Sequence, residues 1–161
     1  MYYSFIYSSP IGQITIASNK DEIVGLWNEG QKYHSFPIEG QMERSPDIPV
    51  LKEAAKWLDQ YFSKKNPRIY DLPLAPIGTD YRKKVWNVLC KIPYGETVSY
   101  GQIAKMLGED TSPRAVGGAV GHNPISIIIP CHRVVGSNGS LTGYAGGIER
   151  KTFLLTLEGC L

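Results

Sequence analysis

The sequence predicts an α+β protein in two parts: a small antiparallel sheet with a helix over residues 1–75, and a winged helix-turn-helix over residues 76–161. Short β-rich runs separated by turn residues open the chain. A helical period of apolar residues then replaces them, and short helices with glycine turns dominate the second half. With 161 residues, 42% of them hydrophobic, the chain is long enough for one large domain or two small ones.

The first part is expected to hold an antiparallel meander and one helix. "YYSFIY", "GQITIAS" and "EIVGLWN" are β-rich runs separated by the turn signals "SSP" and "NKD". "VLKEAAKWLDQYF" changes period, and its apolar helical face comprises Leu51, Ala54, Ala55, Leu58 and Phe62. "RIYDLPLAPIGT" contains prolines and a glycine, so we expect a last edge strand that runs into a linker.

Three short helices are expected to begin the second part. Thr79 or Asp80 can cap the first, which stops at Pro93 and whose apolar face comprises Tyr81, Val85, Val88, Leu89 and Ile92. "TVSYGQIAKMLG" forms the second, which Gly108 ends. In "TSPRAVGGAVGHNP", Ser112 caps the third helix and a proline follows at its first position. The second and third helices make a helix-turn-helix pattern.

Two further elements complete the second part. "VVGSNGSLTGYAGG" is rich in glycine and is expected to form a hairpin or wing. "IERKTFLLTLEG" is expected to be a closing helix, whose apolar side comprises Phe153, Leu154, Leu157 and Leu161. The sequence contains no internal repeat and no low-complexity tract.

Composition excludes a membrane protein and leaves nucleic acid open. No apolar run approaches the roughly 20 residues that span a bilayer, and no signal segment opens the chain. The net charge of +2 is weak, but residues 1–75 carry eight basic and nine acidic residues, whereas residues 76–161 carry nine and six. A polyanion would therefore bind the second part. The three cysteines read as thiols, which indicates a cytoplasmic protein.

The stretch "IIIPCHRVV" carries the candidate nucleophile. Its isoleucines are expected to form a buried strand that Pro130 stops, so Cys131 lies at a sharp turn, at the start of a helical turn. Amide dipoles there favour the thiolate, and His132 and Arg133 add positive charge. The alternative is that Cys131 is a small buried hydrophobe, as we expect for Cys90.

A catalytic cysteine needs a base and a group that orients the base. Consecutive side chains point apart, so we expect a bridging water between Cys131 and His132. Glu158, near the end of the closing helix, is the leading carboxylate to hold the imidazole. The third cysteine, Cys160, is next to last in the chain and is expected to have no role.

Four blocks carry a resemblance to a known family: "IPYGETVSYGQIA", "RAVGGAVGHNP", "PCHRV" and "GYAGGIERKTFLLTLEG". Four blocks in this order make a specific match to one family. The sequence resembles the O6-alkylguanine-DNA alkyltransferases, also called methylated-DNA–protein-cysteine methyltransferases. The resemblance covers residues 79–159, and the first half shows a compatible pattern. It implies a ribonuclease-H-like fold for that half.

The resemblance implies a reaction without metal or organic cofactor. Cys131 would take the alkyl group from O6 of guanine, and related enzymes also act on O4 of thymine. A thioether is not readily cleaved, so each molecule would act once, as a suicide alkyl acceptor. His132 would deprotonate Cys131 through water, and Glu158 would hold His132. Asn123 would link the recognition helix to the active-site strand by hydrogen bonds.

The resemblance also implies base flipping from the minor groove of duplex DNA. Arg114 would fill the space that the flipped nucleotide leaves, and Tyr100 would help to rotate the phosphate and donate toward the purine. The residues expected to contact DNA are Arg114, Ser112, Ala115, Gly117, Gly118, Tyr100 and Arg133. Small residues let a helix approach a narrow groove, although Gly117 and Gly118 could instead pack against a neighbouring helix.

The guanine pocket would be formed by main-chain carbonyls and a few side chains. The resemblance assigns to it the carbonyls of Cys131 and Val134, and the residues Tyr100, Thr142, Tyr144, Ala145 and Lys151. Tyr144 as an ordinary core aromatic and Lys151 as a surface lysine are the open alternatives. Where the family often has Lys or Arg, this chain has His122. His34 is the only Cys or His before Cys90, so a tetrahedral zinc site cannot be built in the first part.

The expected partner is double-stranded DNA that contains O6-alkylguanine, bound by a monomer; cooperative binding of several copies on DNA stays open. Three other functions fit parts of the sequence. The first is a non-catalytic protein that binds alkylation damage, but such relatives carry Trp where Cys131 stands. The second is a winged-helix transcription regulator. The third is a cysteine hydrolase, which nothing beyond the Cys-His pair supports.

Overall fold

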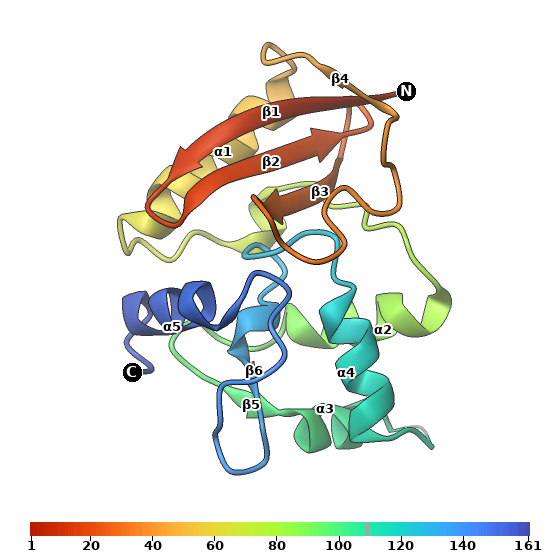
Figure 1. Ribbon diagram of the computed structural model, residues 1–161, viewed down its shortest axis with the longest axis vertical. Coiled ribbons are helices and arrows are strands. Elements are labelled where there is room, and N and C mark those ends of the chain that lie inside the picture. The colour runs from red at the N-terminus through yellow and green to blue at the C-terminus, as the bar shows by residue number, and fades with distance from the viewer. Residues whose placement is uncertain (109) are drawn as a thin grey trace. The chain divides into compact units, whose positions relative to one another are not determined.

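The computed structural model describes residues 1–108 and 110–161, which divide into two compact units (Figure 1). The first unit comprises Met1–Ile77 with Pro124–Ser126, and the second comprises Gly78–Asn123 with Ile127–Leu161. A sheet with one long helix forms the first unit, and short helices dominate the second, which confirms the α+β class. No helix in the described ranges is long and apolar enough to cross a membrane.

The sheet of the first unit has the strand order β3-β2-β1-β4. The predicted meander is confirmed: β1 (Tyr2–Ser9), β2 (Gly12–Ser18) and β3 (Ile23–Asn28) pair in antiparallel fashion. A fourth strand that was not predicted, β4 (Met42–Arg44), pairs parallel to β1. All residues of β3 are buried, although β3 is an edge strand of the sheet.

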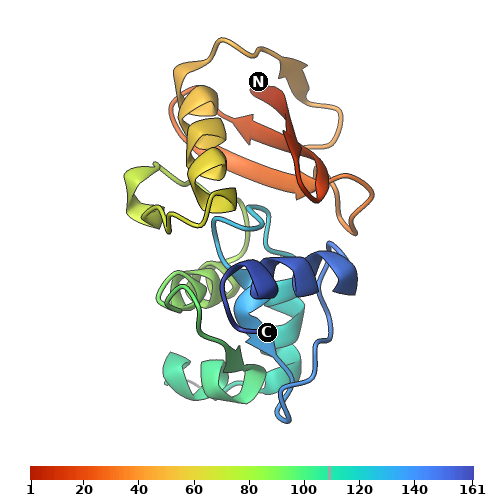
Figure 2. The same ribbon diagram turned by 90° about the vertical axis from the view of Figure 1, so that its left-hand side faces the viewer.

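Helix α1 (Pro49–Phe62) packs on this sheet, as Figure 2 shows. Leu51, Ala54 and Leu58 face inward as predicted. Trp57 and Tyr61 complete the buried face in place of Ala55 and Phe62. Their rings stack at 5.7 Å between centroids, and the large aromatic area that they bury outweighs that of an alanine.

The predicted edge strand after α1 is wrong for most of its length. Ile69–Asp71 form a 3-10 turn (η1), and only Leu74 makes an isolated parallel bridge, with Ile23. Ile23 donates to the carbonyl of Pro73 at 2.8 Å and accepts from Ala75 at 2.8 Å. Prolines lack the N–H that a longer ladder requires, so pairing stops after this bridge.

The first unit also includes a short return of the chain, Pro124–Ser126. Leu26 of β3 donates to the carbonyl of Pro124 at 2.8 Å, and the amide of Ser126 donates to the carbonyl of Leu26 at 3.0 Å. The predicted division of the chain between residues 75 and 76 assigns this return to the second part instead. This return, a few residues before the predicted nucleophile, is therefore anchored on β3, an edge strand of the sheet.

The second unit contains the helices α2 (Asp80–Leu89), α3 (Tyr100–Leu107), α4 (Pro113–Gly121) and α5 (Ile148–Leu157). The predicted caps and the stop at Gly108 are confirmed, but α2 ends at Leu89 rather than at Pro93. Thr79 and Ser112 accept from the backbone of their helices, and Gly108 is left-handed at φ 66°. Ser99 and Gln102 form a reciprocal capping box that fixes the start of α3.

The glycine-rich segment after the nucleophile is a loop and not a hairpin. β6 (Val134–Val135) pairs parallel to β5 (Val98–Ser99), and residues 136–147 contain no strand. A tight turn closes its tip, where Gly136 donates to the carbonyl of Ser140 at 2.9 Å. Glycines give this loop backbone freedom without the alternation of side chains that a second strand requires.

Two other predictions about the second unit are wrong. Ile127–Ile129 are buried but form a turn, with Ile127 at φ 71°, where we expected a strand. The inward face of α5 comprises Lys151, Leu154, Leu155 and Glu158, whereas Phe153 and Leu161 are exposed.

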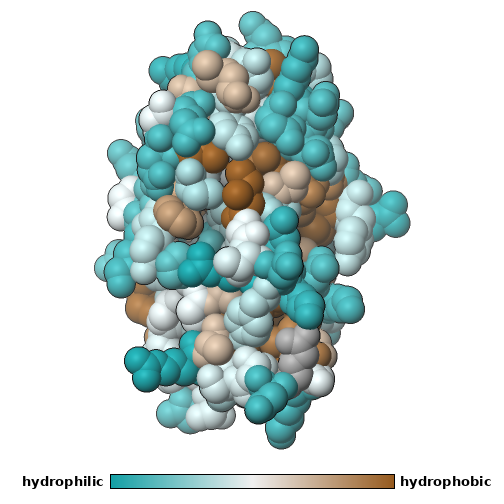
Figure 3. Space-filling view, turned by 90° about the vertical axis from the view of Figure 1, so that its right-hand side faces the viewer, coloured by the Kyte–Doolittle hydropathy of each residue, from teal (hydrophilic) through white to brown (hydrophobic). Residues whose placement is uncertain are grey.

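On the face of the molecule shown in Figure 3, hydrophilic side chains cover most of the surface, with hydrophobic ones in smaller groups between them.

Candidate active site

Cys131 is the first residue of a single 3-10 turn, η2 (Cys131–Arg133), as predicted from the proline before it. The residue is only 4% exposed, and its amide donates to the carbonyl of Ile129 at 2.8 Å. Cys131 thus follows a buried turn and lies inside the unit, where little water reaches the sulfur.

The imidazole of His132 contacts the carboxylate of Glu158. Nε2 of His132 lies 2.6 Å from Oε2 of Glu158, and both side chains are fully buried. Burial lowers the pKa of His132, and the charges of Arg133 and Lys151 lower it further, whereas Glu158 opposes them. Burial alone would raise the pKa of Glu158, but His132 and Arg133 outweigh it and hold this pKa at about 2. The pair therefore combines an ionised carboxylate with a neutral imidazole at pH 7.

Arg133 is misplaced in the predicted DNA-contacting set. Its side chain is 8% exposed, and its Nε and Nη2 donate to the two oxygens of Glu158 at 2.8 and 3.2 Å. Nη1 donates to the carbonyl of Ile92 at 2.7 Å. A guanidinium fully engaged inside the unit is not available to a phosphate. The DNA contact assigned to Arg133 is therefore withdrawn.

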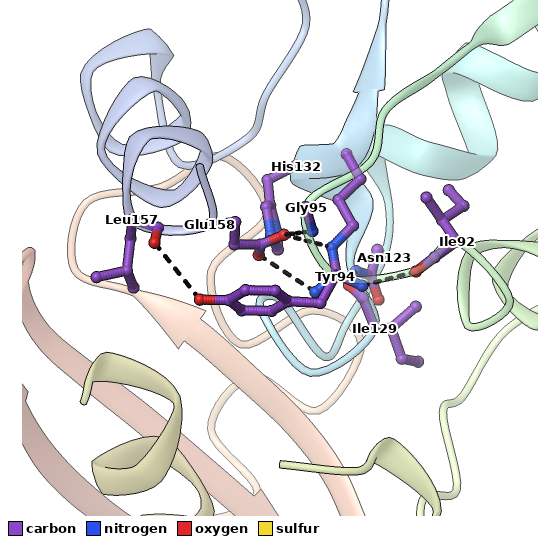
Figure 4. Close-up of polar contacts among 9 residues, drawn as sticks. Ile92, Tyr94, Gly95, Asn123, Ile129, His132, Leu157 and Glu158 are labelled. Carbon is purple, nitrogen blue, oxygen red and sulfur yellow. Dashed lines mark hydrogen bonds and ion pairs between the residues drawn. The ribbon is translucent and has the colours of Figure 1, made fainter. Parts of the chain in front are cut away.

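Further contacts hold Glu158 from the segment after α2 (Figure 4). The amide of Gly95 donates to Oε1 of Glu158 at 3.2 Å, and the hydroxyl of Tyr94 donates to the carbonyl of Leu157 at 3.4 Å. Tyr94 and Gly95 were not predicted as site residues, although both lie in "IPYGETVSYGQIA". Their contacts are long-range in sequence, which spacing cannot reveal.

Asn123 lies between α4 and the turn that precedes Cys131. It is 4% exposed, and its Nδ2 donates to the carbonyl of Ile129 at 2.9 Å. This bond ties the end of α4 to the residue two positions before the thiol. The predicted link between helix and nucleophile has this geometry, except that the tied segment is a turn rather than a strand.

Lys151 of α5 is a buried lysine and not a surface one. It is 1% exposed, and its Nζ donates to the carbonyls of Val134 and Thr142. The carbonyl of Thr142 also accepts from the hydroxyl of Tyr100 at 3.2 Å. Burial lowers the pKa of Lys151 and raises that of Tyr100, and a negative charge on Cys131 raises both. Both groups are therefore close to the sulfur.

The other predicted pocket residues surround this cluster at different depths. Val134 and Tyr144 are buried, Ala145 is half-buried and Thr142 is exposed. Thr142 and Tyr144 come from the loop after β6, and Tyr100 begins α3. The structure thus brings Cys131, Tyr100, Lys151 and the loop carbonyls together within the second unit.

The predicted DNA-contacting residues of α4 share one surface. Ser112, Arg114, Ala115 and Gly118 are exposed, while Val116, Ala119 and Val120 are buried behind them. A Cβ at Gly118 would meet no atom within 4 Å, so internal packing does not require a glycine there. A Cβ at Gly117 would lie 3.8 Å from the ring of Tyr100, which is an ordinary contact. The packing alternative therefore fails for Gly118.

The remaining cysteine and metal candidates have no place in this cluster. Burial raises the pKa of Cys90 to about 11, and the charge of Arg133 only partly opposes it, so this thiol is protonated at pH 7. Among residues 1–108 and 110–161, no three His, Cys, Asp or Glu side chains gather in a way that could hold a metal ion.

A buried thiol next in sequence to a histidine that pairs with a carboxylate, in a unit with the two helices α3 and α4, fits a cysteine-dependent transferase with a nucleic-acid-binding fold. Family models agree with this class. The 6-O-methylguanine DNA methyltransferase DNA binding domain matches residues 80–160, and the ribonuclease-like domain of the same methyltransferase matches residues 1–76. The chain belongs to the 6-O-methylguanine DNA methyltransferase family.

Individual relatives agree over the whole chain. A methylated-DNA–protein-cysteine methyltransferase of Methanosarcina acetivorans is 47% identical over 164 aligned residues, which cover 99% of each chain. The O6-methylguanine methyltransferase of Mycobacterium tuberculosis has a TM-score of 0.87 at 43% identity and covers 98% of this chain and 93% of its own. The M. tuberculosis OGT in complex with DNA has a TM-score of 0.85 at 42% identity, with coverages of 98% and 91%.

Proposed function

We propose that this protein repairs alkylated DNA by moving the alkyl group from O6 of guanine to Sγ of Cys131, once per molecule. The observation that carries the proposal is the buried Cys131 next to His132, whose Nε2 lies 2.6 Å from Glu158. The family of the chain supplies the substrate class. By the same likeness, O4-alkylthymine is a second substrate.

The transfer balances without a cofactor. The proton of the Cys131 thiol passes to His132 through a bridging water, and the thiolate attacks the alkyl carbon in line with the bond to O6. The S–C bond forms as the C–O bond breaks, and the electron pair stays on the guanine oxygen. One proton then returns to the purine at N1, so a neutral guanine leaves and a thioether stays on the protein.

The other residues of the cluster are assigned to substrate and geometry. Glu158 holds His132, and Asn123 fixes the turn before the thiol through Ile129. The guanine pocket takes the carbonyls of Cys131 and Val134 and the residues Tyr100, Thr142, Tyr144, Ala145 and Lys151. Lys151 reaches the carbonyls of Val134 and Thr142, which orients the loop that would cover the base.

DNA binding is assigned to the exposed side of α4. The target base is inside the stack, so it must be flipped out at a cost of a few kcal/mol. We assign Arg114 to the space that it leaves, and Ser112, Ala115, Gly117 and Gly118 to the minor groove. The exposure of Arg114 and Gly118 supports this. Residues 76–161 thus bind DNA and accept the alkyl group, and residues 1–75 support them.

The assembly and the compartment belong to the same proposal. We expect a monomer that acts on double-stranded DNA, with cooperative binding of neighbouring copies to be decided by titration on long duplexes. Three free cysteines support a reducing compartment, which is the cytoplasm.

The test is a mass measurement. The protein is incubated with an excess of duplex that carries one O6-methylguanine, and intact and peptide masses are taken. We expect one methyl group in place of one hydrogen on the Cys131 peptide, in step with loss of the lesion. Cys131→Ala should lose both, while Cys90→Ala, the matched control, should keep both. Loss of several lesions per protein with Cys131 unmodified would overturn the proposal, and binding without any transfer would favour a damage-binding protein.

A further inference from the structure

Arg133 is buried, and its guanidinium donates to the carboxylate of the histidine–carboxylate pair and to the carbonyl of Ile92. We propose that Arg133 is a positioning residue that keeps Glu158 ionised and His132 neutral, so that the imidazole is ready to take the proton of Cys131. The inference rests on the proposed function, because it concerns the base of that reaction.

The hydrogen bonds around Glu158 fix which nitrogen of His132 carries a proton. Oε1 accepts from Nε of Arg133 at 2.8 Å and from the amide of Gly95 at 3.2 Å. Oε2 accepts from Nη2 of Arg133 at 3.2 Å and faces Nε2 of His132 at 2.6 Å. With donors already on both oxygens, the carboxylate is an acceptor only, so Nε2 carries the proton. The lone pair of a neutral imidazole is then on Nδ1, which is the atom left for the proton of the thiol.

The charge of Arg133 also removes the need for an imidazolium. A buried carboxylate requires a compensating cation. The guanidinium of Arg133 supplies this cation through two hydrogen bonds. Without Arg133, His132 would have to supply the positive charge as an imidazolium. If His132 were permanently charged beside Glu158, it could not accept a proton from Cys131.

Other titratable groups around the pair do not replace this charge. Lys151 of α5 is the second cation that acts on His132, but its Nζ is bound to the carbonyls of Val134 and Thr142. Three further titratable groups interact with Arg133 or Glu158: the thiols of Cys90 and Cys160 and the phenol of Tyr94. The thiol of Cys131 interacts with Lys151. All of these are neutral at pH 7 or belong to the reacting thiol. Arg133 is thus a cation in direct contact with the carboxylate, with Nε 2.8 Å from Oε1 of Glu158.

Two contacts hold the guanidinium in place. Nη1 donates to the carbonyl of Ile92 at 2.7 Å, and the guanidinium carbon lies 5.7 Å from the centre of the Tyr94 ring. A lysine could preserve the charge but not the fork, because an ammonium group binds as a point charge. Lysine and glutamine at this position therefore separate the effect of charge from that of geometry.

The experiment measures the rate of Cys131 alkylation by free O6-benzylguanine as a function of pH, for the parent and for Arg133→Gln, Arg133→Lys and Arg44→Gln. The free base requires no DNA, so contacts to phosphates do not enter. In Arg133→Gln the rising limb of the plot of rate against pH should move to higher pH, because loss of the cation makes His132 easier to protonate. Arg133→Lys should keep the limb near that of the parent, with a lower plateau. Arg44→Gln, an exposed change in β4, should match the parent.

An Arg133→Gln limb that coincides with the parent limb, in a variant with parental circular dichroism, would overturn the inference. So would a Lys variant that shifts as far as the Gln variant. If the Gln variant does not fold, ¹⁵N NMR of the parent decides instead: His132 should be a neutral Nε2–H tautomer at pH 7, and an imidazolium there overturns the inference. The NMR result is independent of alkylation, whereas a parent that is never alkylated at Cys131 would refute the proposed function alone.

Discussion

Glu158 is the residue on which the polar contacts of the site converge. It accepts from His132, from Arg133 and from the amide of Gly95, and its side chain is fully buried. Because these donors favour the charged form, they hold the pKa of Glu158 at about 2 against the effect of burial. The same contacts that prepare His132 for catalysis therefore also stabilise the fold, and the two effects can be separated by pH.

The pH dependence of stability should report Glu158 directly. A carboxyl whose pKa is depressed on folding stabilises the protein above its unfolded pKa, and this stabilisation is lost as pH falls from about 4.5 toward about 2. The contribution is on the order of 3 kcal/mol. Glu158→Gln should lose about 3–5 kcal/mol at pH 7, because it leaves the buried Arg133 without an anion, and should then fall less steeply in acid.

Urea unfolding at several pH values between 7 and 2 measures this difference. Glu149→Gln is the matched control, since Glu149 is exposed in the first turn of the same helix. Its curve should stay parallel to that of the parent. If the Glu158→Gln curve were also parallel to the parent curve below pH 4.5, the carboxylate would not have the depressed pKa assigned to it.

At this scale the sequence predicts the proposed reacting residues but not the charged groups that surround them. Cys131 stands out because a proline and a histidine flank it, and Glu158 enters through the resemblance. Arg133 was assigned to DNA with the other residues that the resemblance implies. Its compensation comes from Glu158, 25 positions further along the chain, which is a contact that no local pattern encodes. No local pattern predicts the contacts of Lys151 either, since its partners are backbone carbonyls.

Among the elements, α4 has the least ordinary composition. Three of its nine residues are glycine, although glycine is less favourable than alanine within a helix by about 1 kcal/mol per residue. Arg114 and Gly118 are one turn apart and both are exposed, so they lie on the same side. A helix that keeps a glycine where nothing crowds it gives up stability, which fits the close approach to DNA that we propose for α4.

Gly118→Ala should separate stability from DNA repair. The added Cβ meets no atom within 4 Å, so the variant should be more stable by up to about 1 kcal/mol. It should nevertheless repair duplex DNA more slowly, while its reaction with free O6-benzylguanine stays at the parent rate. Arg114→Ala should show the same split between duplex and free base. Thermal melting and the two alkylation rates measure these effects.

Gly108→Ala gives the opposite control for stability. Gly108 ends α3 at φ 66°, where an alanine is strained, so this variant should lose about 1 kcal/mol. Parental rates on both substrates for Gly118→Ala, with the higher stability, would show that the glycine has no part in approaching the groove.

Elements with caps were easier to predict than buried segments. Ser99, Ser112 and Gly108 mark helix ends because their side chain or backbone freedom satisfies groups at those ends. The run Ile127–Ile129 predicted burial correctly but not conformation, since an apolar run fits a buried turn as well as a strand. The closing helix shows the same limit, because polar Lys151 and Glu158 occupy the inward face that leucines were expected to fill.

For the whole molecule, the division of the chain matters most between α4 and the nucleophile. Pro124–Ser126 belong to the first unit, whereas Asn123 before them and Ile127 after them belong to the second. Two backbone hydrogen bonds attach this return to Leu26 of β3. Within the second unit, Asn123 is bonded to Ile129 across the return. The position of Cys131 therefore depends on an anchor that the second half of the sequence does not contain.

Separating the two halves should slow the reaction of Cys131 even without DNA. Two backbone hydrogen bonds at about 1 kcal/mol each correspond to roughly a tenfold or larger change in how often the turn holds its reactive geometry. Residues 78–161 alone should therefore react with free O6-benzylguanine at least about tenfold more slowly than the full chain, and added residues 1–77 should restore part of the rate. Leu26→Ala in residues 1–77 keeps both backbone hydrogen bonds, so it should leave most of the restored rate intact. Leu26→Pro removes the N–H that donates to Pro124, so it should lower the restored rate. A C-terminal piece that reacts as fast as the full chain would show that the catalytic turn needs no anchor outside its own unit.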